Sequence, residues 1–134
     1  GLSERQFPRA RRSNRLHLDH AHNIRLEPDI TWWDNATCVL IGDIKYKRTV
    51  TGDGKNADLY QVLAYAKATQ LDNATLIYAN TESATTTHRT PDGTALHIEA
   101  LDLDGEPDQI LDEVNAIAGR LRQRCNYRTL SATA

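Results

Sequence analysis

The sequence predicts an α/β fold in which a mixed central β-sheet is flanked by helices. Between residues 23 and 47, apolar residues alternate with polar ones as they do in half-buried strands. In 58–70 and again after Pro107, they recur at helical spacing. Two further apolar segments, 74–78 and 95–103, are short enough to be strands. Strands and helices that alternate along one chain indicate helices packed on a sheet.

Composition predicts one soluble domain. The chain has 134 residues, 40% of them hydrophobic, and a net charge of −2, so contact with nucleic acid would need a local basic patch or a partner protein. No apolar run approaches the roughly 20 residues that cross a bilayer, and no segment resembles a signal peptide. Cys38 and Cys125 have no CxxC spacing, which fits a reducing, cytoplasmic location with structural thiols.

The chain is expected to contain an arm, a main domain and a tail. Residues 1–22 are rich in arginine and histidine and form an N-terminal arm or linker; a solvated linker is favoured over an arm that contacts phosphates. The domain spans 23–128, and 129–134 form a C-terminal tail. The sequence has no methionine and opens on Gly-Leu-Ser, so we expect it to be a piece of a longer protein.

The first two strands are expected to pair as a hairpin. Ile24, Leu26, Ile30 and Trp32 alternate with polar residues, and Asp34-Asn35 supplies the turn before the strand 37–47. In that second strand the period of two places Asp43, Lys45 and Lys47 on one face. The polar groups at its end therefore point the same way.

The remaining helices, strands and loops are predicted from the periodicity of apolar residues. Residues 51–56, with two glycines, are expected to form a flexible loop before the helix 58–70. The strand 74–78 would run parallel to 37–47 in a βα unit. Residues 81–93 should be an exposed connection, 95–103 a further strand, and Pro107 the start of the last helix. The apolar stripe of that helix comprises Ile110, Leu111, Val114, Ile117, Ala118 and Leu121.

Two carboxylates and an ammonium group stand at the end of otherwise apolar strands. Asp29 follows Pro28, and Asp43 and Lys45 follow the run Val39-Leu40-Ile41-Gly42. Charges in such places cost free energy unless they are paired, which suggests a metal site. Phosphodiester hydrolysis needs a cation to stabilise the charge that develops on phosphate oxygens, and Mg²⁺ commonly takes one or two carboxylates. The pattern is typical of a nuclease centre.

These residues resemble a known nuclease motif. Pro28-Asp29 and Asp43-Ile44-Lys45 are similar to the PD-(D/E)xK motif of nucleases with the restriction-endonuclease-like fold. With the flanking segments 26–30, 41–47 and 58–66, the chain resembles the McrC nuclease domain of McrBC-type restriction systems, over about residues 24–79. Many members of the wider fold carry a helix before the first catalytic strand, whereas the corresponding stretch here is short and Arg-rich.

The resemblance implies a role for each residue. Asp29, Asp43 and the Ile44 carbonyl would bind Mg²⁺ or Mn²⁺, and Lys45 would be the catalytic lysine. Gln61 would lie beside the site, with Tyr65 and Lys47 contacting the substrate. The implied activity is a metal-dependent endodeoxyribonuclease of a defence system, acting on modified duplex DNA with a McrB-like AAA+ GTPase. The chain has no GxxxxGK[ST] motif of its own, and a homodimer is left open.

Two other functions are compatible with the pattern. The first is a resolvase-like or repair nuclease of the same fold, which would differ in the DNA structure it cuts. The second is a non-catalytic assembly module that stimulates a GTPase and whose acidic site no longer binds metal. Measurement of Mn²⁺ binding separates the second from an active nuclease.

Other conspicuous residues are expected to be structural. His17, His20 and His22 lack the spacing of a closed zinc site, so we expect surface histidines. Trp32 and Trp33 should place one ring in the core and the other at an edge or partner surface, rather than stack on bases. Glu27 shares a strand face with Asp29, but a solvated carboxylate is favoured over an outer ligand. Tyr65 fits packing on the sheet as well as a place in the site.

Overall fold

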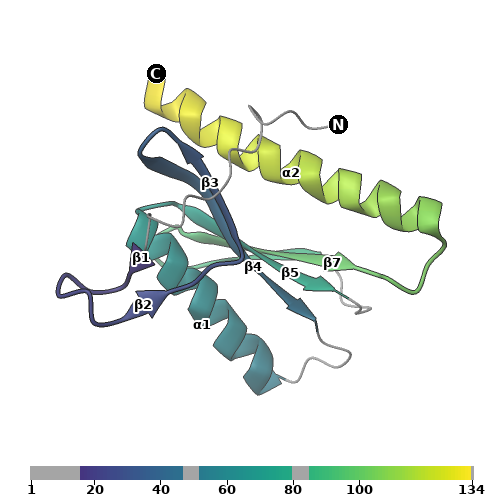
Figure 1. Ribbon diagram of the computed structural model, residues 1–134, viewed down its shortest axis with the longest axis horizontal. Helices are drawn as coiled ribbons and strands as arrows, with labels where there is room; N and C mark the ends of the chain where they lie inside the picture. Colours follow the sequence, from purple (N-terminus) through teal and green to yellow (C-terminus); the bar gives the residue numbers. More distant parts are fainter. Residues whose placement is uncertain (1–15, 47–51, 80–84, 134) are drawn as a thin grey trace.

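The computed structural model describes residues 16–46, 52–79 and 85–133, with the side chains of 52–55 and 126–133 left out of the description. It contains a two-stranded sheet, a five-stranded mixed sheet and, within the described residues, two helices. This arrangement confirms the predicted α/β class and is compatible with a restriction-endonuclease-like fold (Figure 1). Neither of the helices in this part of the chain combines the length and apolar character needed to cross a bilayer.

The central sheet has the order β3-β4-β5-β7-β6. β3 (Ile30–Asp34) and β4 (Thr37–Tyr46) form the predicted antiparallel hairpin, and β4 runs parallel to β5 (Asn73–Ala79). β5 runs parallel to β7 (Ala95–Leu101), and β6 (Thr86–Arg89) pairs antiparallel with β7. Parallel neighbours need a crossover: the connection from β4 to β5 carries the first helix, and the one from β5 to β7 contains β6. The second helix follows β7.

Each face of the sheet is covered by one helix (Figure 1). On the face of α1 (Gly52–Thr69), Val62, Tyr65 and Ala66 pack with Ile41 and Leu76 in one buried cluster. On the face of α2 (Pro107–Thr133), a second cluster comprises Leu40, Ile77, Ile117, Leu121 and Cys125. The period of two along β4 and β5 therefore distributes their side chains between two cores.

The two tryptophans pack on opposite faces of the central sheet. Trp33 packs against the α1 cluster and Trp32 against the α2 cluster, and both are half-buried. The expectation that only one ring faces a core was wrong, because both faces of this sheet are covered. Cys38 and Cys125 are buried in the cores on the α1 and α2 faces, as expected of structural thiols.

Two backbone features set the position of β4 between β3 and β5. Gly42 lies so close to β5 that an added Cβ would overlap the backbone carbonyl of Thr75, so glycine allows the two strands to pair at this point. The turn between β3 and β4 places Asn35 at a φ of 57°, a left-handed conformation that asparagine tolerates better than most residues. The turn predicted at Asp34-Asn35 is confirmed.

Two small strands form a separate ribbon beside α1. β1 (Leu16–His17) pairs antiparallel with β2 (Arg25–Leu26), and Leu16 and Leu26 pack against the α1 cluster. The connecting turn is held by the Asp19 carboxylate, which accepts hydrogen bonds from the backbone N–H groups of Asn23 and Ile24. This ribbon leads the chain directly into the segment that contains Asp29.

The structure corrects two predicted loops. The helix expected from residue 58 already begins at Gly52, because extending a helix that is fixed by packing costs only the weak propensity of each added residue. The predicted connection 81–93 contains β6, whose four residues Thr86–Arg89 lack an apolar period but gain backbone hydrogen bonds to β7. Residue 51 of the predicted loop and 81–84 of the predicted connection lie outside the described residues.

The predicted stripe of the last helix is only half right. Ile117 and Leu121 are buried, as expected, whereas Leu111 is 58% exposed and Val114 41%. The reason is that α2 is longer than the surface it packs on, so its first turns extend past the sheet (Figure 1). Apolar periodicity identifies which side of a helix is apolar, but not how much of its length meets a partner.

Candidate active site

Asp29 directly precedes β3, and Asp43 lies at the same level on the antiparallel neighbour β4. The last residue pair of β3 and β4 is Ile30 with Gly42, so continuing the register by one residue places Asp29 opposite Asp43. The backbone N–H of Asp29 donates a hydrogen bond to Oδ1 of Asp43 at 3.2 Å. In return, Oδ2 of Asp29 accepts one from the backbone N–H of Ile44 at 3.0 Å. The two predicted acidic residues therefore meet in the fold.

The Asp43 side chain is buried in an unfavourable electrostatic setting. Only 4% of it is exposed to solvent. Burial raises the pKa of this carboxyl group, and the neighbouring Asp29 raises it further, while Lys45 opposes the change. Like charges directly opposite each other repel. Among the described residues, the positive charge beside Asp29 and Asp43 does not offset this repulsion and the cost of burial, in agreement with the raised pKa of Asp43.

Lys45 provides one positive charge beside the pair. Its Nζ lies 2.9 Å from Oδ2 of Asp43, and 24% of its side chain is exposed. Burial alone would lower the pKa of this lysine, but the hydrogen bond to Asp43 and the charges of Asp43, Asp58 and Asp29 raise it overall. Lys45 therefore keeps its proton at neutral pH while remaining accessible from solvent.

The backbone of Ile44 faces the same edge as Asp29. Its N–H points to the Asp29 carboxylate, and the N–H and C=O of one residue in an extended strand leave the chain on the same side. The Ile44 carbonyl is therefore directed to the edge at which Asp29 lies. The Ile44 side chain points to the other face and is 46% exposed.

Tyr65 connects α1 to the segment that leads into Asp29. It is 1% exposed, and its hydroxyl donates a hydrogen bond to the backbone carbonyl of Glu27 at 3.3 Å. Burial, followed by the charges of Asp43 and Asp29, raises the pKa of Tyr65 to about 12. The hydroxyl therefore stays protonated at neutral pH and acts as a donor that fixes this segment.

A cavity of about 390 Å³ opens beside Tyr65. Gln61, which forms a hydrogen bond with Tyr65, lines this cavity together with Arg25, Glu27 and Ala64. Asp29 and Asp43 are outside its lining, but their charges act on Tyr65, which is part of it, so the cavity lies close to the acidic pair. Both predicted helix residues, Gln61 and Tyr65, are thus near the site, whereas Lys47 falls outside the described residues.

The sequence prediction missed Asp58 and Tyr78. Asp58 is 7% exposed, and its Oδ2 accepts a hydrogen bond from the Tyr78 hydroxyl at 2.9 Å. Tyr78 is the β5 residue paired in register with Lys45 of β4. The available signal was the spacing of Asp58, Gln61 and Tyr65, which share one helix face at i, i+3 and i+7.

The remaining candidates lie apart from the pair. His17 and His22 stack with their ring centroids 4.3 Å apart, in the ribbon that precedes the site. Glu27 is exposed and forms an ion pair with Arg25 at 3.2 Å, which is the solvated position expected for it. Among the described residues, no three histidine, cysteine, aspartate or glutamate side chains are grouped to hold a metal ion.

The acidic pair nevertheless fits a hard divalent cation. Mg²⁺ keeps several of its waters and commonly takes only one or two carboxylates from a protein, which Asp29 and Asp43 provide. Their mutual repulsion, and the raised pKa of Asp43, are the conditions that a bound cation relieves. The donor set is all oxygen, as this class of ion prefers.

The chain matches one described protein family. Residues 4–79, which contain Asp29, Asp43, Lys45 and the α1 helix, match the McrBC 5-methylcytosine restriction system component family. No curated protein matches the chain significantly. The matched region covers more than half of the sequence and includes every residue of the candidate site described above. The chain therefore belongs to the family of McrBC 5-methylcytosine restriction system components.

Proposed function

We propose that this chain is a metal-dependent endodeoxyribonuclease and the cleavage subunit of a McrBC-like restriction system, hydrolysing phosphodiester bonds of modified duplex DNA. The observation that carries the proposal is the convergence of Asp29 and Asp43, in which the Asp29 N–H donates to Asp43 and the Ile44 N–H donates to Asp29, with Lys45 at 2.9 Å from Asp43. Family membership supports the role in restriction.

Asp29 and Asp43 would hold Mg²⁺ or Mn²⁺, with the Ile44 carbonyl as a third ligand. The ion would supply positive charge to the scissile phosphate and lower the pKa of a bound water. The hydrogen bond from Ile44 N–H to Asp29 and the one from Asp29 N–H to Asp43 fix both carboxylates before any ion arrives. Such preorganisation is what electrostatic stabilisation of a transition state requires.

Lys45 would act on the attacking water or on the phosphate. It holds its proton at neutral pH, so its ammonium group donates hydrogen bonds and offsets phosphate charge. Gln61 and Tyr65 line the neighbouring cavity and would orient the substrate there. Lys47, two residues beyond Lys45 in the chain, would contact the DNA backbone.

The subunit would work with a separate motor. The 134-residue sequence has no GxxxxGK[ST] motif, so recognition and translocation of modified DNA would come from a McrB-like AAA+ GTPase. The net charge of −2 agrees with this division, because a chain without an overall basic field depends on its partner to bring DNA to the site. The complex would act in the cytoplasm.

The direct test is cleavage by the complete subunit together with its GTPase, GTP and Mg²⁺ on methylated duplex DNA. Asp43→Asn should abolish cleavage, and Lys45→Ala should lower its rate by about 10²–10⁴-fold, the usual contribution of a positioned proton-transfer group. Matched controls are Asp34→Asn, at the exposed far end of β3, and Lys67→Ala, an exposed lysine paired with Asp92. Both controls should cleave normally.

Two outcomes contradict the proposal. A folded Asp43→Asn, Lys45→Ala double variant that still cuts would remove the catalytic assignment. Cutting of branched or single-stranded DNA in preference to the methylated duplex would identify the repair-type nuclease instead.

A further inference from the structure

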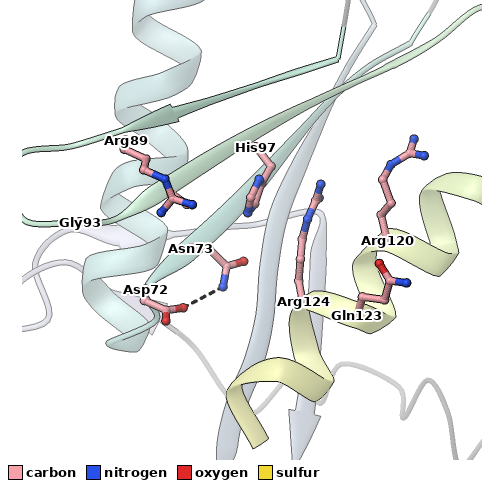
Figure 2. A pocket seen from close by; sticks show the side chains of 9 residues that line it. Asp72, Asn73, Arg89, Gly93, His97, Arg120, Gln123 and Arg124 are labelled. Atoms are coloured by element: carbon pink, nitrogen blue, oxygen red, sulfur yellow. Dashed lines mark hydrogen bonds between the residues drawn. The ribbon is translucent and has the colours of Figure 1, made fainter. Parts of the chain in front are cut away.

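A second cavity, of about 340 Å³, lies on the face of the sheet opposite to the acidic pair. It is located where β5 and β7 begin, at Asn73 and Ala95, between the end of β6 and α2 (Figure 2). Arg89 reaches into it from β6, His97 from β7, and Arg124 from α2, so three elements supply nitrogen-bearing side chains to one space. None of the proposed nuclease residues lines it.

A fully buried carboxylate fixes two of the arginines. Glu99 is 0% exposed and accepts hydrogen bonds from Nη2 of Arg120 at 2.7 Å and from Nη2 of Arg124 at 2.6 Å. Nη1 of Arg124 also donates to the Thr75 hydroxyl at 2.9 Å. A guanidinium group has five N–H donors, so these contacts hold both groups in place and leave N–H groups for a ligand.

The charge of the cavity is positive. Three arginines, at positions 89, 120 and 124, stand against two carboxylates, Glu99 beneath the cavity and Asp72 at its rim. Burial, followed by the charge of Arg124, lowers the pKa of His97 to about 4, so the imidazole is neutral. Arg89 is exposed and has no ion pair among the described residues. Arginine N–H donors therefore exceed the anionic acceptors.

We propose that this cavity binds a phosphate group, either as inorganic phosphate or as the phosphate of a mononucleotide. Arginine forks match phosphate oxygens in pairs, which makes arginine the common residue for phosphate recognition. A volume of about 340 Å³ is near the lower end of the range for small-molecule sites, so it admits a mononucleotide but not a duplex. The inference is independent of the proposed nuclease activity, since it concerns different residues on another face.

The test is calorimetric titration of the metal-free chain, in a chelating buffer, with inorganic phosphate and, separately, with guanosine monophosphate. Saturable binding of either is expected, and Arg89→Gln should weaken it about tenfold, the loss of one charge-assisted hydrogen-bond pair. Arg89 is exposed at the end of β6, so this variant should fold. The matched control is Arg122→Gln, which also removes one arginine charge. Arg122 lies on α2 outside the cavity lining, so this variant should leave the affinity unchanged.

Comparison of the two ligands distinguishes a site for inorganic phosphate from a site for a mononucleotide. Equal affinities identify inorganic phosphate as sufficient, and tighter binding of the nucleotide identifies a nucleotide site. Amide and side-chain NMR shifts should localise at His97 and Arg124 and spare Ile44. Absence of saturable binding by both ligands, equal weakening by Arg89→Gln and Arg122→Gln, or shifts centred on Ile44 would overturn the proposal.

Discussion

Asp43 and Glu99 are both buried carboxylates in the central sheet, but they lie on opposite faces in opposite electrostatic settings. Glu99 accepts hydrogen bonds from Arg120 and Arg124, and these outweigh the effect of burial and lower its pKa. Asp43 has one lysine and faces a second carboxylate, Asp29, so burial and repulsion raise its pKa. The α2 face thus carries a compensated charge, and the α1 face one that lacks compensation.

The comparison distinguishes a buried carboxylate that stabilises the fold, Glu99, from a candidate functional carboxylate, Asp43. A buried charge persists in a fold only when partners offset the cost of removing it from water. Glu99 has those partners within the protein, so it can serve to hold α2 on the sheet. Asp43 lacks part of that compensation, which is typical of functional sites and agrees with the divalent cation that we propose for it.

Removing the charge of Glu99 should have the largest effect on the stability of the fold. Glu99→Gln leaves two guanidinium groups without their buried counter-charge, and 15% of the Arg124 side chain is exposed, so it cannot simply turn to solvent. The free energy of unfolding should fall by about 3–5 kcal/mol, measured by urea denaturation. Glu113→Gln, at an exposed residue of α2, is the control and should change little. A loss for Glu99→Gln no larger than the control would show that Glu99 is not a structural anchor.

The same kind of change at Asp43 should have the opposite sign in metal-free protein. Asp43→Asn keeps an acceptor for the Asp29 N–H and removes the repulsion between two carboxylates. The free energy of unfolding should rise, by less than Glu99→Gln lowers it, because the ion pair with Lys45 is lost as well. Thermal melting in a chelating buffer checks this. Destabilisation by Asp43→Asn would mean that the site is already compensated.

The smallest effect is in the dependence of stability on pH. The lowered pKa of Glu99 means that its stabilisation is present above its ordinary value of 4.5 and is lost as pH falls through the folded value. The raised pKa of Asp43 means that stability is lost as pH rises from its ordinary value of 3.8 through the folded value. Urea titrations from about pH 3 to pH 7 should therefore flatten on the acid side in Glu99→Gln.

In Asp43→Asn, the same titrations should lose the decline in stability that accompanies ionisation of Asp43. Slopes that change in the same direction for both variants would contradict the assigned pKa directions.

The side of the molecule with the acidic pair could be predicted well from sequence. The alternating pattern of β3 and β4 and the turn at Asn35 fix the hairpin, and its register brings Asp29 opposite Asp43. The helix carrying Gln61 and Tyr65 was also predicted, although it begins at Gly52 and not at residue 58. Local periodicity and one hairpin are sufficient to assemble this region.

The opposite side could not be predicted, since it depends on contacts distant in sequence. Glu99 and Arg124 are 25 residues apart, and Arg124 and Thr75 are 49 apart, with nothing in the pattern of either segment to indicate that they meet. Asp58 was visible in the sequence, but its burial against Tyr78 comes from the pairing of β5 with β4. Short-range sequence patterns predict helices and strands. A buried polar network can be predicted only when the order and pairing of the strands are known.

The most direct test of the account is titration of the chain with Mn²⁺ by calorimetry, followed by location of the ion from its anomalous scattering in crystals. The account predicts one ion shared by the carboxylates of Asp29 and Asp43, and loss of that binding in Asp43→Asn but not in Asp34→Asn. A chain that binds no Mn²⁺, or that binds it at a position away from this pair, would contradict the central claim.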